Sequence, residues 1–196
     1  MPDTSASLLD RIRLHPDGPS WKRLVDLYTP LIQGWLRRFG GALQSHDLDD
    51  LVQDVLGQVI RGLPTFQHSH RAGAFRCWLR TIAVHRLLAF RRAQKSRPMT
   101  YGDNSIDEEL AQLEDPESDL STLWDQEHDQ YVLQRLRELI EPEFNAKSWQ
   151  SFTRTALKGE RAAAVAADLG MTVNAVLLAK SRVLRRLRQE SRGLID

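Results

Sequence analysis

The chain has 196 residues, of which 41% are hydrophobic, and a formal net charge of +1. This length allows either one medium hydrophobic core or two small ones, and we favour two. The single cysteine, Cys77, excludes an internal disulfide and suits a reducing compartment. No apolar run is long enough to cross a bilayer and the N-terminus does not read as a signal peptide, so we expect a cytoplasmic protein without membrane insertion.

The charged residues are segregated along the chain. Residues 71–98 contain eight Lys or Arg and no acid, whereas residues 99–134 contain eleven Asp or Glu and no base. The chain becomes basic again after Lys180. A charge run is often only a solvated helix face, but solvated helices usually interleave both signs, because opposite charges at helical spacing stabilise them. The basic segments therefore favour a polyanionic partner.

Apolar spacing of three and four residues recurs from the N-terminus onward and strand alternation is rare, which predicts an all-α fold. A weak helix is expected over residues 5–14. A longer one is expected over 20–39, with Ser20 as its cap and Gly40 as its stop, and Pro30 should kink or divide it.

The next helix shows the clearest periodicity, and Pro64 closes it. A polar loop at 67–73 follows, and then a helix over about 74–94 with one apolar face and one arginine-rich face. In the helix that Pro64 closes, the apolar positions are Leu48, Leu51, Val52, Val55, Leu56, Val59, Ile60 and Leu63.

Residues 98–120 are polar and acidic, and their composition predicts a linker between two helical domains, 1–97 and 121–196. Such a linker is either a solvated tether or, as the family resemblance given below implies, a connector drawn into a channel that later holds RNA. Helices should resume over about 120–140 and 146–157.

A helix-turn-helix is predicted near the C-terminus. Residues 162–169 form a short first helix, Gly170 makes the turn, and Thr172 caps a second helix that runs to about Arg192. Val176, Val183 and Leu187 should pack inward, so the opposite side of the second helix can enter a DNA major groove.

The segments 49–56, 75–83 and 85–92 resemble the core-binding and promoter-melting region of bacterial RNA polymerase sigma factors. The C-terminal pair is similar to their second DNA-binding domain. The resemblance covers about 21–97 and 148–192, and the order of two such domains with a short linker resembles the extracytoplasmic-function (ECF) group. It implies region 2-like and region 4-like domains that bind RNA polymerase core, at the β′ clamp and β flap, and direct promoter-specific initiation by recognising and melting promoter DNA.

The same resemblance implies no enzymatic activity and no cofactor, because the polymerase performs the chemistry. It leaves open whether an anti-sigma factor is a further partner. The positions that match the polymerase-binding helix are Asp50, Leu51, Gln53, Asp54 and Leu56. The acids could simply favour a helix start and the leucines a core, and for Leu51 that reading is preferred; Gln53 and Asp54 point away from the apolar stripe.

Recognition of the minus-ten element is expected from one set of residues. Phe66 and His85 match positions that bound a pocket for a flipped base, whereas an aromatic at the place of Trp78 is more often core, and the loop 67–73 is longer than is usual in the family. A positive helix face gains affinity for phosphates without reading sequence. The full set is Phe66, Arg76, Trp78, Arg80, His85, Arg86, Arg91 and Arg92.

Recognition of the minus-thirty-five element is expected from the second helix of the C-terminal pair. Arg and Asn can read guanine and adenine, whereas Leu and Ala can meet only thymine methyl groups. Many relatives carry polar residues where this chain has residues 177–179, so this helix reads shape and methyl groups, or its leucines pack on a partner. The matching positions are Thr172, Asn174, Ala175, Leu178, Ser181, Arg182 and Arg185.

Two other functions remain as alternatives. A zinc site would need His68, His70, Cys77 and His85, but their spacing fits no common zinc pattern. A stand-alone regulator would bind duplex DNA through the helix-turn-helix without polymerase, usually as a dimer on paired half-sites. That function would leave the arginine-rich helix and the acidic helix without a purpose.

Overall fold

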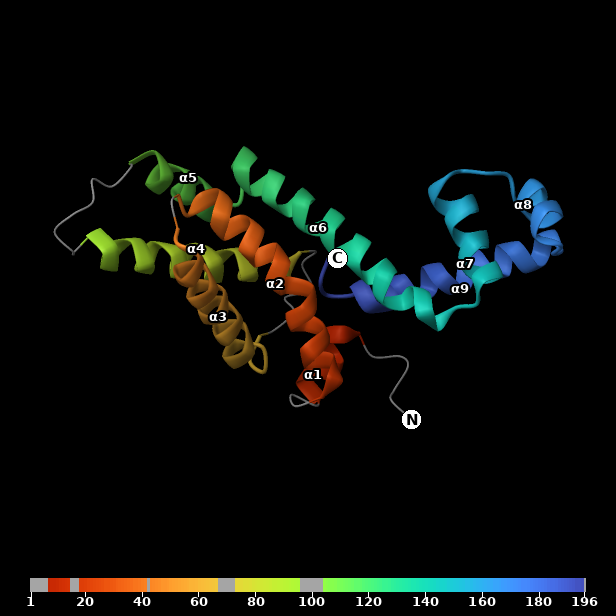
Figure 1. Cartoon of the computed structure of the whole chain (residues 1–196), viewed down its shortest axis with the longest axis horizontal. Coiled ribbons are helices and arrows are strands. Elements are labelled where there is room, and N and C mark those ends of the chain that lie inside the picture. The colour runs from red at the N-terminus through yellow and green to blue at the C-terminus, as the bar shows by residue number, and fades with distance from the viewer. Residues whose placement is uncertain (1–6, 15–17, 42, 67–72, 96–103, 196) are drawn as a thin grey trace. The chain divides into compact units, whose positions relative to one another are not determined.

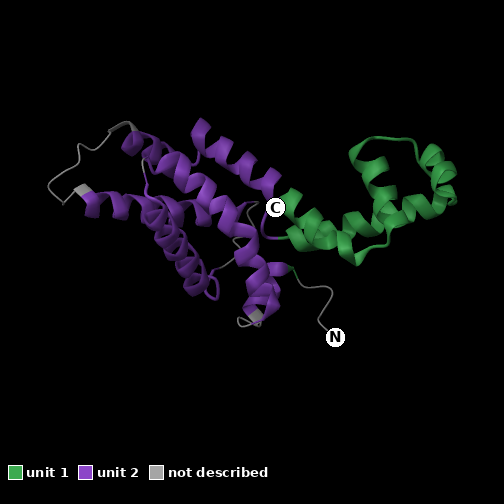
Figure 2. Ribbon diagram, viewed as in Figure 1, with its two compact units in different colours: residues 1–7, 133–192 green, residues 8–132, 193–196 purple. Residues whose placement is uncertain are grey.

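The computed structural model describes residues 7–14, 18–41, 43–66, 73–95 and 104–195. Every regular element in these ranges is helical, which confirms the predicted all-α class. The chain divides into two compact units, coloured separately in Figure 2. Unit 1 comprises residues 1–7 and 133–192, and unit 2 comprises residues 8–132 and 193–196.

Unit 2 is built on three long helices, with α3 packed against both α2 and α4 (Figure 1). Each helix buries side chains at helical spacing, which is why the amphipathic pattern is so clear in the sequence. The helices of this unit are α1 (Leu8–Leu14), α2 (Pro19–Phe39), α3 (Ser45–Gly62), α4 (Ala74–Lys95), α5 (Asn104–Glu114) and the first part of α6 (Asp119–Ile140).

Helix α2 differs in two details from the sequence prediction. Its N-cap is Gly18, followed by Pro19 in the first turn, and not Ser20. A proline suits this position because the amide hydrogen that it lacks would have had no partner inside the helix. The helix also continues through Pro30 as one element, so the predicted division does not occur.

The predicted linker is partly a packed helix. Within 98–120, residues 104–114 form α5, which packs on α4 and α2, while residues 98–103 lie outside the described ranges. Leu110 and Leu113 are each 1% exposed. They lie three residues apart and form an apolar stripe that the acidic composition of the segment conceals. A solvated tether is therefore wrong for α5.

The boundary between the compact units lies inside α6, after Val132, and not near residue 120. The first part of α6 is held to unit 2 by side chains. The indole of Trp124 is 3% exposed and stacks on that of Trp35 in α2, with an angle of 24° between the ring planes. His128, one turn further, is fully buried.

Unit 1 consists of the end of α6 and a group of short helices around one long helix. Helix α9 packs against α7 and α8, and its buried Val176 joins Val165 and Ala166 in a small core. The elements after α6 are η1 (Glu141–Glu143), α7 (Ala146–Phe152), the π-helical turn η2 (Thr153–Leu157), α8 (Ala162–Leu169) and α9 (Val173–Ser191).

By length and composition, no single helix among the described residues could cross a membrane. The pair α8 and α9 passes the same test only when its helices are joined, and it is bent by 105°.

Candidate nucleic-acid interface

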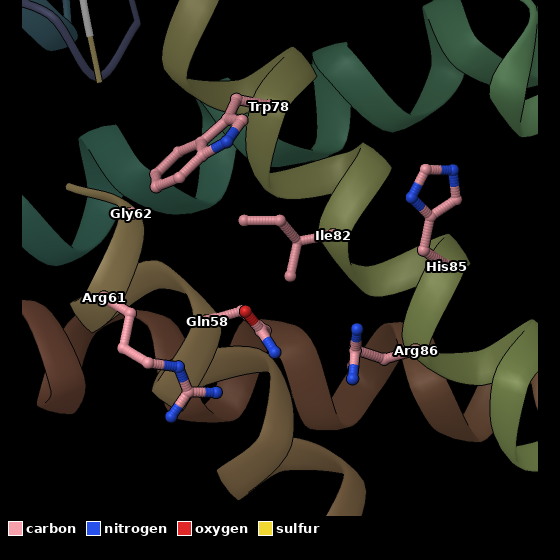
Figure 3. Close-up of a pocket in the computed structure, with 7 residues that line it drawn as sticks. All are labelled: Gln58, Arg61, Gly62, Trp78, Ile82, His85 and Arg86. Carbon is pink, nitrogen blue, oxygen red and sulfur yellow. The ribbon is translucent and has the colours of Figure 1, made fainter. Parts of the chain in front are cut away.

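An open pocket of about 400 Å³ lies between α3 and α4 (Figure 3). Helix α3 supplies one wall and α4 the other, so both walls come from elements with well-buried apolar faces. The two walls present an indole, amide and guanidinium groups, and an imidazole. The lining residues are Gln58, Arg61 and Gly62 of α3, and Trp78, Ile82, His85 and Arg86 of α4.

The indole of Trp78 is the flat surface of this pocket. It stacks on the ring of Phe66 with centroids 4.6 Å apart and makes an edge contact with Phe75. Gly62 makes room for it, since a Cβ at this glycine would lie 2.6 Å from an indole carbon. Trp78 is half-buried, and it is therefore fixed on one side and open to the pocket on the other.

Phe66 takes a supporting position. It is half-buried between Trp78 and Phe75, and the guanidinium of Arg13 lies 5.9 Å from its ring centroid. Of the two aromatic candidates, Trp78 lines the pocket, and Phe66 backs it. The loop residues 67–72, which include the candidate zinc ligands His68 and His70, lie outside the described ranges.

Three of the arginines predicted to meet DNA are instead paired inside unit 2. Arg80 is 4% exposed and donates to Asp125 at 2.7 Å, and Arg76 also pairs with Asp125, at 3.2 Å. Arg91 donates to Asp107 of α5 at 3.0 Å. The acidic segment thus neutralises one face of α4, because α5 and α6 fold back onto it. The prediction of DNA contacts by Arg76, Arg80 and Arg91 is corrected accordingly.

The paired arginines continue into a buried polar chain. Arg76 donates to Asp129 at 2.9 Å, and Asp129 lies 2.9 Å from Nδ1 of His128. Because a carboxylate can only accept, the imidazole proton is on Nδ1, and Nε2 accepts from the hydroxyl of Tyr28 at 3.1 Å. Burial lowers the pKa of His128, against the opposing effect of Asp129, and raises the pKa of Tyr28. Both side chains are therefore neutral at pH 7.

The other face of α4 remains basic and open. Arg86 lines the pocket, Arg92 is exposed, and His85 is 59% exposed with Nε2 lying 3.4 Å from Glu114. Within the described ranges, no carboxylate forms an ion pair with Arg86 or Arg92. These two arginines and His85 stay on the surface that the sequence predicted.

Two pocket residues, Gln58 and Arg61, were not predicted from the sequence. Both lie on α3, near the end of a helix that was assigned only to polymerase binding, and both line the pocket (Figure 3). Helical spacing held a signal, since residues 58 and 61 are one turn apart and outside the apolar stripe of α3. What it could not supply was the position of α4 opposite them.

The first half of α3 presents a separate acidic surface. Asp50, Gln53 and Asp54 are exposed, whereas Leu51 and Leu56 are each 3% exposed and belong to the core. The core position preferred for Leu51 is confirmed, whereas the predicted contact of Leu56 with a partner is corrected, because its side chain is buried under the helix. The exposed surface is therefore polar and negatively charged.

Helices α8 and α9 meet at a tight turn. Gly170 ends α8 with φ of 61°, a left-handed conformation that glycine adopts without strain. The hydroxyl of Thr172 then accepts from the amide of Ala175 at 3.2 Å and caps α9. Val176, Val183 and Leu187 are buried, as predicted.

The exposed side of α9 carries most of the predicted upstream-element residues. Ala175 is half-buried and contributes less surface than the others, and Thr172, besides capping the helix, is exposed. The exposed residues from 174 to 188 are Asn174, Leu177, Leu178, Ser181, Arg182, Arg185 and Arg188.

An ion-pair group fixes the start of α8. Arg154 of η2 donates to Glu160 at 2.8 Å and to Asp168 at 2.6 Å, and these hydrogen bonds raise its pKa and lower that of Glu160. The group ties the loop before α8 and the end of α8 to η2. It thereby helps to hold α8 in position relative to α7.

Comparison with known proteins finds one family match. Residues 24–97 match the family described as Sigma-70 region 2. This range contains α3, the pocket and α4. A search of curated proteins finds no significant match. The match covers the segment for which the sequence predicted polymerase binding and promoter melting, so this segment is similar to region 2 of sigma-70 family sigma factors.

Proposed function

We propose that this chain is a sigma factor of the ECF group that binds RNA polymerase core and directs promoter-specific transcription initiation. The Sigma-70 region 2 match supports the general role in polymerase binding and promoter recognition. The ECF assignment and the roles of individual residues are the proposal. In this role the chain has no catalytic residues and needs no cofactor, since the polymerase performs the chemistry.

The observation that carries the proposal is the open pocket between α3 and α4. A base that leaves the DNA stack needs a flat partner and polar groups that recognise its edge. Trp78 offers the flat surface, and Gln58 and Arg86 offer hydrogen-bonding groups on opposite walls (Figure 3). Arg61 and Arg92 supply positive charge for the neighbouring phosphates. The pocket thus has the parts needed to trap an unpaired base of the minus-ten element.

The acidic surface of α3 is proposed as the polymerase-binding site. Asp50, Gln53 and Asp54 are exposed on a helix whose leucines are buried, so a partner can reach them without unfolding the unit. By the resemblance, that partner is the β′ clamp. The β flap and an anti-sigma factor remain proposed partners of the chain as a whole.

Helices α8 and α9 are proposed as the helix-turn-helix that reads the upstream promoter element. The bend between them, the left-handed Gly170 and the capped start of α9 support this assignment. The exposed Asn174 and Arg182 can reach base edges, and Arg185 can reach a phosphate.

Reconstitution with core polymerase tests the proposal. The full chain should bind core in a one-to-one complex, start transcription at defined sites, and make thymines near the start reactive to permanganate. Trp78→Ala should keep the complex but reduce permanganate reactivity about 5- to 160-fold, because base stacking is worth about 1–3 kcal/mol. Arg37→Ala, which removes an exposed arginine of α2 outside the pocket, serves as the control.

The alternative of a stand-alone regulator predicts a different outcome. Such a protein would protect duplex DNA at a specific site without polymerase, and core would not change its footprint. Specific binding by the chain alone, together with failure to form a complex with core, would overturn the proposal.

A further inference from the structure

Exposed apolar side chains are concentrated at the start of α9. Among the described residues seven large apolar side chains are exposed, and three of them lie within 173–178. Val173 is 44% exposed, and Leu177 and Leu178 are each 49% exposed. Single exposed apolar residues are ordinary, but three within two helical turns form a patch, and a patch indicates a binding surface.

The patch is set between polar residues in two rows along α9. Residues four apart lie one above the other on a helix. Leu178 therefore lies between Asn174 and Arg182, and Leu177 lies between Val173 and Ser181. All six of these residues are exposed, whereas Val176 and Ala179, on the other side of α9, are buried.

The charge around the patch decides which partner fits. From residue 169 to 189 the chain has five Lys or Arg and no Asp or Glu. Arg186 is paired with Glu143, but Arg182, Arg185 and Arg188 are exposed and continue the side of α9 that carries the leucines. The phosphates of DNA can pair with these arginines. In its major groove, DNA also offers apolar groups to the leucines, namely the C5 methyl groups of thymine.

We propose that Leu177 and Leu178 read thymine methyl groups in the upstream promoter element, an inference that rests on the proposed function. One helical turn rises 5.4 Å, and base pairs are spaced about 3.4 Å apart. The bases under the two leucines thus lie between those that Asn174 and Arg182 can reach. The upstream element that this chain recognises therefore has one or two A·T pairs between those two bases, with their thymine methyl groups against the leucines.

The test begins with the promoter itself. Holoenzyme reconstituted from the full chain and core polymerase selects active promoters from DNA whose upstream element is randomised. Enrichment of thymine at adjacent positions, between bases of fixed identity, is the expected result. If no promoter is selected, the proposed function fails; if promoters are selected without such thymines, only the present inference fails.

Deoxyuridine then replaces each selected thymine singly, which removes the C5 methyl group and keeps base pairing. Replacing a contacted thymine should weaken holoenzyme affinity for the promoter about fourfold, which corresponds to about 0.8 kcal/mol for one buried methyl-sized group. Thymines elsewhere in the upstream element should show no loss. An unchanged affinity at every position overturns the inference.

Variants link the methyl groups to the leucines. In the double variant with Leu177→Ala and Leu178→Ala, replacing thymine by deoxyuridine should not weaken holoenzyme binding further, because the apolar contact is already gone. Both leucines are about half exposed and alanine favours helices, so the fold should persist, which a thermal melt checks. Leu157→Ala removes an equally exposed leucine from η2 and is the matched control, which should retain the full deoxyuridine loss.

The same variants separate DNA from a protein partner. If the double variant loses binding to core polymerase, or loses transcription while the deoxyuridine penalty stays unchanged, the leucines contact protein and the inference is wrong. Loss of the deoxyuridine penalty with core binding intact supports it.

Discussion

Arg80 of α4 donates a 2.7 Å hydrogen bond to Asp125 of α6, 45 residues further along the chain. The arginine side chain is 4% exposed and the aspartate side chain 24% exposed. A buried guanidinium needs its carboxylate, because an unpaired charge in the protein interior is strongly disfavoured. This pair therefore makes the first part of α6 a structural component of unit 2.

Asp125→Ala should lower the free energy of unfolding by about 3 kcal/mol, since it leaves Arg80 buried without its counterion. Urea titration of the full chain measures the loss. Glu127→Ala is the matched control on the same helix, because Glu127 pairs with Arg38 at the surface, where both side chains are more than one third exposed. The control should lose at most about 1 kcal/mol. Equal losses would show that the Arg80 pair has no special role.

Arg91 and Arg92 are adjacent in sequence but should behave differently toward DNA. Arg92→Ala should reduce the salt dependence of holoenzyme binding by about one unit in the slope of log affinity against log salt. Arg91→Ala should leave the slope unchanged, because Arg91 is 12% exposed and donates to Asp107. Binding measured from low to moderate salt tests both variants. A reduced slope for Arg91→Ala would contradict the division of α4 into two faces.

Gly62→Ala should impair promoter opening, because the added Cβ would lie 2.6 Å from an indole carbon of Trp78. The indole can move away from the added methyl group only by losing its stacking on Phe66. We therefore expect its position in the pocket to change. Permanganate reactivity should fall several-fold while binding to core persists. Gly34→Ala in α2 meets nothing within 4 Å and should stabilise the chain by about 0.5–1 kcal/mol. Normal opening by Gly62→Ala would contradict the proposed role of Trp78.

His128 should make the stability of unit 2 depend on pH in a defined direction. Burial, the largest cause, holds its pKa below the ordinary value of 6.5, so the unfolded chain takes up a proton more readily than the folded chain. The contribution of neutral His128 to the free energy of unfolding is complete above about pH 6.5. It is lost as the pH falls from there through the lowered pKa of the folded state.

His128→Gln should remove this pH dependence. It should also lower the free energy of unfolding by about 1–3 kcal/mol at pH 7, because the hydrogen bonds to Tyr28 and Asp129 are weakened. Urea titrations between pH 5 and 8 provide the measurement. His85→Gln, at a 59% exposed position, should retain the dependence of the parent chain. Parallel pH profiles for the parent and His128→Gln would exclude His128 as the cause.

Gly170→Ala should destabilise unit 1 by about 1–2 kcal/mol through backbone strain alone. Its φ is +61° and nothing lies within 4 Å of the added Cβ, so no side-chain clash contributes. Gly170→Asn should recover much of the loss, because asparagine tolerates the left-handed region. Thermal unfolding of the full chain measures both variants. Equal destabilisation by alanine and asparagine would indicate a cause other than the turn.

The sequence predicted the helices of the chain well. Helices α8 and α9 were placed by the glycine and threonine between them, which act locally, and α3 by its apolar spacing. Helix α5 was missed because two buried leucines are a weak pattern within an acidic composition. Its burial depends on α2 and α4, which lie elsewhere in the sequence.

The candidate pocket was predicted only in part. Trp78, His85 and Arg86 were identified from one helix, whereas Gln58 and Arg61 required knowledge of how α3 faces α4. Leu56 was assigned to polymerase binding by its position in a motif, although helical spacing already placed it on the apolar stripe, as was preferred for Leu51. Motif position and burial are separate properties, and only packing decides between them.

The sequence by itself determined the helical class of this protein, its main helices and the order of basic and acidic segments, because periodicity, capping and charge are properties of neighbouring residues. Only the tertiary structure decided which arginines of α4 remain available to a nucleic acid. An ion pair such as that of Arg80 and Asp125 depends on the folding of α6 back onto α4, and a contact between residues so far apart leaves no local signal in the chain.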